Sequence, residues 1–149
     1  MQTQPEREIF VANYEQGRPQ VVWTTLVADL ETPVSALLKL GDGRPYSFLL
    51  ESVEGGATRG RYSIIGTRPD LIWRCRGDRA EINRRARIAR DAFVPEEAPS
   101  LESLRRLIAR SRIAMPPGLP PPAAGLFGYM AYDMVRLMER LPEKNPDRL

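Results

Sequence analysis

The sequence contains no histidine and a single cysteine, Cys75. Histidine is the commonest general base near neutral pH, so its absence removes every serine–histidine and cysteine–histidine nucleophile pair. A lone cysteine cannot form an internal disulfide, and without histidine no cysteine–histidine zinc framework can be built. Zinc is thus set aside, and any catalysis by this chain would need carboxylates, lysines or tyrosines.

Long apolar runs are also missing. Apolar runs such as residues 21–28 are far shorter than the roughly 20 residues that a helix needs to cross a bilayer, and the polar start is not a signal peptide. We therefore expect no membrane segment and a cytoplasmic location. The chain has 149 residues, of which 42% are apolar and 28% charged. Both values are typical of a globular protein, and the length favours one domain with a real core.

Hydrophobic patterning and turn residues predict several short strands and a few helices. The predicted strands are residues 21–28, 46–53, 61–66, 69–76 and 125–131, and the predicted helices are residues 33–40, a segment that starts at Ser100, and residues 133–141. Strands outnumber helices, and their short links favour antiparallel pairing. The predicted fold is therefore α+β, with an antiparallel sheet and helices packed on one side.

Local chemistry fixes some of these boundaries. Thr32 is a good N-cap for the first predicted helix, Gly41 can end it in a left-handed conformation, and Ser100 is the expected N-cap of the second. The second helix is amphipathic, with an apolar stripe made of Leu101, Leu104, Leu107 and Ile108.

The dipeptide Gly77-Asp78 suits a two-residue type II′ hairpin turn because glycine comes first. Such a turn fixes the register of the strands on either side. It predicts the cross-strand pairs Trp73 with Ile82, Arg74 with Glu81, and Cys75 with Ala80.

Residues 49–66 are the most informative stretch, because two apolar segments enclose a polar, glycine-rich connection. The carboxylate of Glu51 could pair with an ammonium group, the hydroxyl of Ser52 could hydrogen-bond a ligand, and Arg61 could bind a carboxylate. By themselves these residues are more typical of a solvated strand edge than of a binding site. Neighbours on a regular strand face opposite sides, so we expect the strand to break near Glu51 if one ligand contacts both.

Two segments together resemble a known family. The first contains Leu49-Leu50-Glu51-Ser52 and Gly60-Arg61-Tyr62-Ser63, and the second is Gly125-Leu126-Phe127-Gly128-Tyr129-Met130-Ala131-Tyr132-Asp133. In this order they resemble the N-terminal region of the large subunit, component I, of anthranilate synthase, a chorismate-utilising family. The resemblance covers about residues 20–149 and leaves residues 1–19 as an extension. It implies that the chain forms part of a larger two-sheet fold.

The resemblance implies a regulatory site and no catalytic one. In the family the first signature belongs to the feedback site for L-tryptophan, so the implied effector-binding residues are Leu50, Glu51, Ser52 and Arg61. The parent enzyme converts chorismate and ammonia from a glutamine amidotransferase, component II, to anthranilate and pyruvate. Its catalytic, substrate-binding and magnesium-binding residues lie in a later portion with no counterpart here. No catalytic, substrate-binding or metal residue is therefore assigned, and the chain alone is predicted to be inactive.

Other interpretations stay open from the sequence. The related aminodeoxychorismate synthase component I of folate synthesis shares the fold, and a free-standing amino-acid-binding module would need no further portion. A nucleic-acid binder is a third possibility, because residues 59–90 hold ten arginines against Asp70, Asp78 and Glu81. No recognised nucleic-acid motif is present, so a solvated basic face without a nucleic-acid partner is favoured. We also expect an exposed apolar patch, which is a candidate dimer interface.

Overall fold

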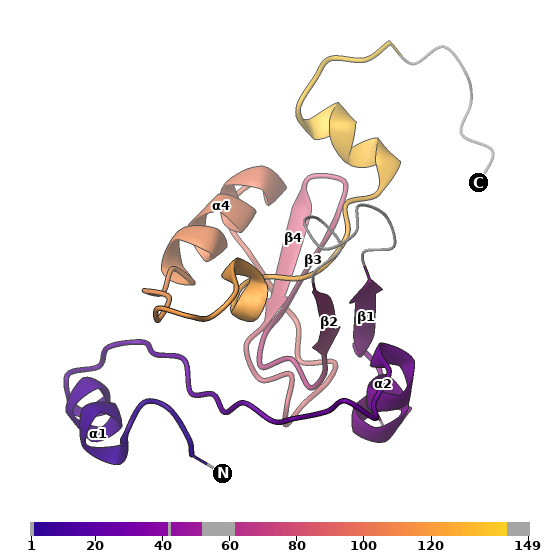
Figure 1. Cartoon of the computed structure of the whole chain (residues 1–149). Coiled ribbons are helices and arrows are strands. Elements are labelled where there is room, and N and C mark those ends of the chain that lie inside the picture. Colours follow the sequence, from indigo (N-terminus) through magenta and orange to yellow (C-terminus); the bar gives the residue numbers. More distant parts are fainter. Residues whose placement is uncertain (1, 42, 52–61, 143–149) are drawn as a thin grey trace.

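The computed structural model describes residues 2–41, 43–51 and 62–142 (Figure 1). Its helices are Arg7–Glu15 (α1), Pro33–Gly41 (α2) and Ser100–Arg110 (α4), with 3₁₀ helices at Pro121–Ala123 (η1) and Tyr132–Leu137 (η2). Its strands are Phe48–Glu51 (β1), Ser63–Gly66 (β2), Ile72–Arg76 (β3), Arg79–Asn83 (β4) and Val94–Pro95 (β5).

The strands form two small antiparallel sheets. Strands β1 and β2 make one, and β3, β4 and β5 in that order make the other. The predicted α+β fold is confirmed, although the strands are divided between two sheets. Arg68, between β2 and β3, has φ of 52°, a left-handed conformation that a continuing strand does not adopt. The chain therefore changes direction there and starts a separate sheet.

The β3–β4 hairpin has the predicted register. Trp73 pairs with Ile82, Arg74 with Glu81, and Cys75 with Ala80. In the turn, Gly77 has φ of 54°, whereas Asp78 is not among the described residues with positive φ. This combination defines a type II′ turn and confirms the prediction from the sequence.

A small core lies between this sheet and α4. Ala80, Ile82 and Leu107 are its buried apolar side chains, and Ile82 is only 1% exposed. Ser103 of α4 is buried among them, and its hydroxyl accepts a hydrogen bond of 2.9 Å from Nε1 of Trp73. This bond gives the indole N–H a partner and ties the helix to β3.

The hairpin turn also holds the beginning of α4. Pro99 takes the N-cap position, so Ser100 is the first helical residue and the prediction that it caps the helix is wrong. Its amide donates to Asp78 Oδ1 at 2.8 Å, and its hydroxyl donates to the carbonyl of Gly77 at 3.2 Å. The carboxylate of Asp78, which is distant in sequence, thus caps the helix in place of a neighbouring residue. Its negative charge is favourable at a helix N-terminus.

Replacing Asp78 with alanine is expected to destabilise the chain by about 1 kcal/mol, the usual cost of losing a capping side chain. Urea denaturation would show this as a lower midpoint at constant slope. Asp91→Ala is the matched control, since Asp91 is exposed and its carboxylate forms no hydrogen bond or ion pair with the described residues. Equal midpoints for the two variants would contradict this role for Asp78.

Two predicted strands are wrong in the described part of the chain. In residues 21–28 the backbone forms only an isolated bridge, between Trp23 and Gln4, and Val27 is 89% exposed. Residues 125–131 pair with no strand. Both segments have strand-forming side chains, but a strand also needs a neighbour to accept its hydrogen bonds, and the described residues offer none beyond Gln4.

Other elements differ in their bounds. Strand β1 starts two residues later than predicted, because Tyr46 has φ of 61° and cannot join a strand. Strands β2 and β3 are likewise shorter than predicted. The last predicted helix is the shorter 3₁₀ helix η2. In α4 the inward stripe is confirmed for Leu107, whereas Ile108 is exposed.

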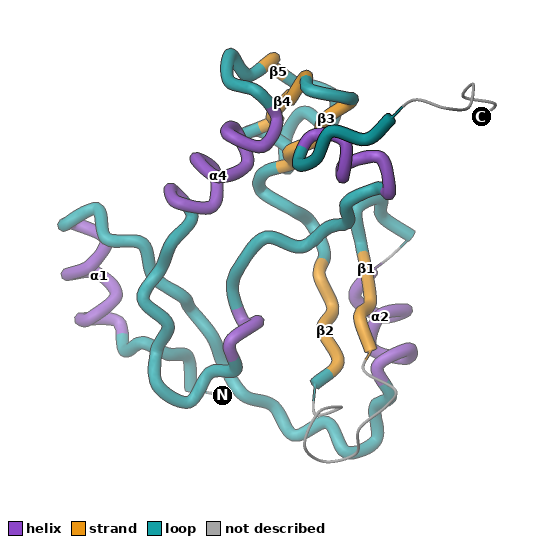
Figure 2. Tube along the Cα trace, turned by 90° about the horizontal axis from the view of Figure 1, so that it is seen from above, coloured by secondary structure: helices purple, strands orange, loops and turns teal. Residues whose placement is uncertain are grey.

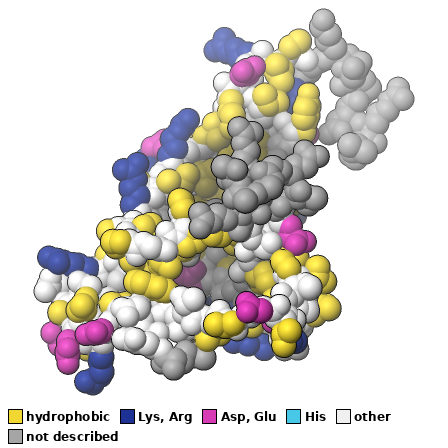
Figure 3. Space-filling model, in the orientation of Figure 1, with side chains coloured by type: hydrophobic (Ala, Val, Ile, Leu, Met, Phe, Trp, Pro, Cys, Tyr) yellow, Lys and Arg dark blue, Asp and Glu magenta, His cyan; other side chains and the backbone are white. Residues whose placement is uncertain are grey.

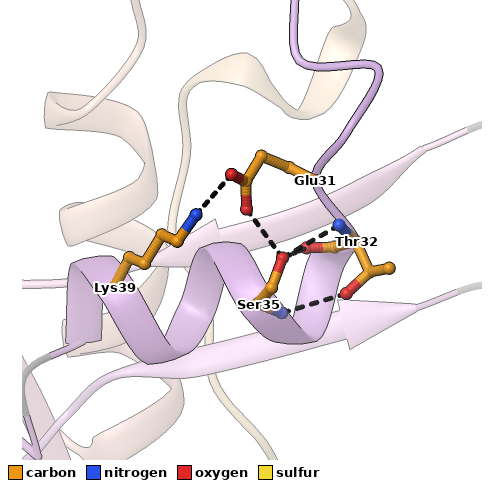
Figure 4. Close-up of polar contacts among 4 residues, drawn as sticks. All are labelled: Glu31, Thr32, Ser35 and Lys39. Carbon is orange, nitrogen blue, oxygen red and sulfur yellow. Dashed lines mark hydrogen bonds and ion pairs between the residues drawn. The ribbon is translucent and has the colours of Figure 1, made fainter.

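Helix α2 has the predicted N-cap. The Thr32 hydroxyl accepts the amide of Ser35 at 3.1 Å, and the Ser35 hydroxyl donates to Glu31 at 2.7 Å (Figure 4). Lys39, one turn further on, donates to the other oxygen of Glu31. The hydrogen bonds from Lys39 and then Ser35 lower the pKa of Glu31 below its ordinary value. This exposed cluster fixes the start of α2.

The Glu31 carboxyl is expected to titrate below its ordinary pKa in carbon-detected NMR. Its ionised form is favoured in the folded chain, so its contribution to stability is present above the unfolded pKa and is lost as the pH falls through the folded pKa. Lys39→Ala is expected to raise the Glu31 pKa, whereas Arg18→Ala, far along the chain, should leave it in place. An unchanged titration in Lys39→Ala would show that the ion pair does not form in solution.

Candidate functional site

The candidate site lies at one end of the β1–β2 ribbon. The strands are in register from Phe48 opposite Gly66 to Glu51 opposite Ser63. A methyl group at Gly66 would come within 2.2 Å of the Phe48 ring, so only glycine lets the aromatic side chain lie across the strand pair. The other end of the ribbon carries the polar pair Glu51 and Ser63, and both residues are exposed.

The two faces of the ribbon meet different neighbours. Ser47 faces Gly41 of α2, and α2 packs against both strands (Figure 2). By strand alternation Glu51 lies on this same face. On the other face, the ring of Phe48 packs against the ring of Phe127, with 5.1 Å between ring centroids and an angle of 32° between the ring planes. This contact places the Gly125–Tyr129 part of the second sequence signature next to the strand that carries the first signature.

The structure places two of the four predicted site residues. Leu50 is 50% exposed on the Phe48 face, and Glu51 is exposed on the α2 face. Ser52 and Arg61 lie outside the described residues, and so does the backbone at which the strand was expected to break. Because Leu50 and Glu51 face opposite sides, one ligand can contact both only around the end of the ribbon.

The register adds a residue that the motif did not single out. Ser63 lies directly opposite Glu51, and in an antiparallel pair such side chains are about 4.5–5.5 Å apart at Cβ. Its hydroxyl therefore lies within reach of a ligand held by the Glu51 carboxylate. The sequence motif missed this residue, because the long connection between the two strands leaves their register open.

Chemically, the end of the ribbon suits a small zwitterion. A carboxylate at Glu51 can pair with an ammonium group, and a hydroxyl at Ser63 can donate or accept a hydrogen bond. Leu50 offers exposed apolar surface on the adjoining face. No described group in this arrangement supplies a nucleophile activated by a neighbouring base, so the arrangement favours binding over catalysis.

A separate hollow lies beside α1, away from the ribbon in Figure 1. It has a volume of about 440 Å³ and is lined by Thr3, Pro5, Arg7, Phe10 and Val22. Arg7 is its only charged lining residue, so it lacks a carboxylate that could hold an ammonium group. We therefore take the end of the ribbon, and not this hollow, as the candidate site.

Two arginines of the basic stretch, Arg74 and Arg84, are engaged within the chain. Arg74 forms an ion pair of 2.8 Å with Glu81 and lies over the Phe93 ring at 3.6 Å, and Arg84 forms an ion pair of 3.1 Å with Glu96. These contacts use guanidinium groups that a nucleic acid would otherwise engage. They weaken the alternative of a nucleic-acid binder.

The buried side-chain amide of Asn83 holds the turn that follows β4 through hydrogen bonds. Asn83 is fully buried, and its Nδ2 donates to the carbonyls of Ala89 and Arg90 at 2.7 and 2.8 Å. Its Oδ1 accepts the amide of Arg85 at 2.8 Å. The side chain thus satisfies three backbone groups of the arginine-rich turn, a structural role for this part of the basic stretch.

No family model and no solved structure matches this chain. Curated proteins do match. One from Cereibacter sphaeroides is 57% identical over 142 residues, which is 95% of this chain and 28% of that protein. One from Thermus thermophilus is 41% identical over 127 residues, 84% of this chain, and one from Synechocystis sp. is 40% identical over 134 residues, 89% of this chain. This chain spans 25% of the length of each of these two.

The chain therefore corresponds to one region of a class of much longer proteins. It spans about a quarter of the length of the curated relatives it matches. Each of these relatives is named anthranilate synthase component 1. The chain is homologous to an N-terminal region of anthranilate synthase component 1, the family that its two signatures resemble. None of the helices in the described part of the chain is both long and apolar enough to span a membrane.

Proposed function

We propose that this chain is the regulatory N-terminal part of an anthranilate synthase component 1 and contributes part of a feedback site for L-tryptophan. The exposed end of the β1–β2 ribbon, where Glu51 of the signature lies opposite Ser63, is the observation that carries the proposal. Glu51 would pair with the ammonium group of the effector, and Arg61 would bind its carboxylate. Ser52 and Leu50 would complete this half of the pocket.

The parent enzyme would convert chorismate and ammonia to anthranilate and pyruvate in tryptophan biosynthesis, in the cytoplasm. A glutamine amidotransferase, component II, would supply the ammonia. The longer curated relatives support this proposal, since each is named anthranilate synthase component 1. The same names favour anthranilate synthase over the related aminodeoxychorismate synthase. They also favour a part of a longer enzyme over a free-standing amino-acid-binding module.

Magnesium and the reacting groups would lie outside this chain. In the described part of the chain, no three histidine, cysteine, aspartate or glutamate side chains gather where they could hold a metal ion. We therefore derive no catalytic step from these residues. The role proposed for them is to bind the effector and to transmit its presence to a distant chorismate site, which requires a coupling free energy between the two.

The chain alone is expected to form no anthranilate from chorismate, ammonia and magnesium. In a complete component 1 that carries this sequence, the same assay is expected to show turnover that L-tryptophan inhibits. Anthranilate fluorescence measures both. Robust turnover by the pure chain would contradict the absence of catalytic residues, and a complete enzyme that is insensitive to tryptophan would contradict the regulatory role.

A further inference from the structure

The hollow beside α1 lies between two segments of the chain that are joined by backbone hydrogen bonds. The amide of Gln4 donates to the carbonyl of Trp23 at 2.7 Å, and the amide of Trp23 donates to the carbonyl of Gln4 at 2.8 Å. Thr3 and Pro5, on either side of Gln4, line the hollow, and so does Val22 beside Trp23. The bridge therefore holds these three lining residues together.

Helix α1 forms the remaining wall and is held to the same part of the chain. The side-chain amide of Gln20 donates to the carbonyl of Phe10 at 2.9 Å, and that of Asn13 donates to Oε1 of Gln20 at 3.2 Å. Phe10 lines the hollow, and its ring stacks on that of Tyr14 with 6.1 Å between the centroids. Both walls are thus fixed by hydrogen bonds, and the hollow is preformed, as small-molecule sites usually are.

The lining combines apolar surface with one free cation. Pro5, Phe10 and Val22 are apolar, and Val22 is 52% exposed. Arg7 completes the lining, and its guanidinium forms no ion pair or hydrogen bond with the described residues. A guanidinium has a planar set of donors that matches the two oxygens of a carboxylate. The hollow therefore offers both an anion-binding group and an apolar surface next to it.

The acidic residues of α1 do not line this hollow. Glu8 and Glu15 line a separate depression that Arg7 also borders. Helical spacing places Arg7 and Phe10 on one face of α1, with Glu8 and Glu15 roughly a quarter of a turn round the helix. Side chains of both charges accordingly gather around α1, together with apolar ones, on the face drawn in Figure 3. Within the hollow itself Arg7 is the only charge.

We propose that the hollow beside α1 binds a small aromatic carboxylate. Arg7 would hold the carboxylate through paired hydrogen bonds, and the hydroxyl of Thr3 would donate to it as well. The aromatic ring would lie against Pro5, Phe10 and Val22. The volume of about 440 Å³ falls within the usual range for small-molecule sites. No lining carboxylate is available for an ammonium group, so an amine is disfavoured.

This ligand class differs from the zwitterion proposed for the end of the β1–β2 ribbon. The inference goes beyond the proposed function and does not rest on it, since it uses only residues 3–22 and their contacts.

Indole-3-propionate is a suitable probe, because it has an aromatic ring and a carboxylate but no ammonium group. Titrated into the isotope-labelled chain, it is expected to shift the amide NMR signals of residues 3–10 and 22 with saturation, at a dissociation constant on the order of 1 mM or below. Tryptamine has the same indole ring and an ammonium group in place of the carboxylate. It should bind at least about ten-fold more weakly, because it cannot pair with Arg7.

Arg7→Gln is expected to weaken the binding of indole-3-propionate by about ten-fold or more, since it removes the charge-assisted hydrogen bonds. Arg18→Gln is the matched control, because Arg18 is an exposed arginine of the same part of the chain and does not line the hollow. Glu51→Ala separates the hollow from the ribbon. Neither of these two variants should change the binding of the probe.

Any of four results would overturn the inference. These are the absence of saturable shifts at residues 3–10 and 22, equal binding of indole-3-propionate and tryptamine, unchanged binding in Arg7→Gln, or loss of binding in Glu51→Ala. The last result would place the probe at the ribbon. The comparison with tryptamine uses the unaltered chain, so it decides the question even if Arg7→Gln does not fold. None of these measurements depends on inhibition by tryptophan, so a failed regulatory site would leave their outcome unchanged.

Discussion

Replacing Glu51 or Ser52 with alanine in the complete component 1 is expected to raise the L-tryptophan concentration for half-inhibition roughly ten- to a hundred-fold. In the proposed site, each substitution would remove a hydrogen bond to a charged ligand, which costs about 1.5–3 kcal/mol. Glu51 is exposed at the end of the ribbon and contacts no element of the small core, so the cost should fall on the effector and not on folding. Turnover without tryptophan should stay close to that of the parent.

Inhibition curves for anthranilate formation measure this effect. Glu97→Ala and Ser111→Ala are matched controls, since both residues are exposed and their side chains form no hydrogen bond or ion pair with the described residues. By linkage, tryptophan weakens chorismate binding by the same factor by which chorismate weakens tryptophan binding, so the antagonism measured from either ligand should change together. Unchanged inhibition, or loss of basal activity in a folded variant, would contradict the proposed site. Glu51 would then be only a solvated residue at the end of a strand.

The elements that were predicted well from the sequence are those whose determinants are local. Gly77 and Asp78 specify a type II′ turn by themselves, and the turn then fixes every pair of the β3–β4 hairpin. Thr32 caps α2 through an amide only three residues away. In both cases the interacting groups are close in sequence, so composition and spacing contain the information that the structure uses.

The elements that were predicted wrongly depend on distant partners. Residues 21–28 and 125–131 have the side chains of strands, but the described residues provide no neighbour for them beyond Gln4. The N-terminus of α4 also depends on a group that is distant in sequence. Its capping group is Asp78, 22 residues from Ser100, and nothing in the spacing indicated that contact.

The residues of the candidate site were identified partly from the local sequence motif and partly from the pairing of two distant strands. The family signature identified Leu50 and Glu51, and the structure places both at the exposed end of the ribbon. Ser52 and Arg61 remain predictions from the resemblance. Ser63 came from the antiparallel register, which a motif read along one strand does not contain.

Replacing Ile82 with alanine is expected to be the most destabilising of the substitutions considered. Ile82 is 1% exposed at the centre of the small core, and truncating a buried isoleucine to alanine costs about 2–5 kcal/mol through lost burial and the cavity left behind. Ala80 and Leu107 are the only other buried apolar side chains recorded in the described residues, so little is available to refill that space. The expected loss is a large part of the 5–15 kcal/mol typical of a domain.

Urea denaturation followed by tryptophan fluorescence measures this loss. Trp73 lies opposite Ile82 and reports on the core, and a Trp23→Phe background removes the signal of the chain's second tryptophan. Ile88→Ala is the matched control, because it is the same substitution six residues further along, at a side chain that is 81% exposed. If both variants lost the same stability, the packing of α4 on β3 and β4 would not be what holds this unit together. A loss confined to Ile82→Ala would show that a core of three apolar side chains supports the hairpin that caps α4.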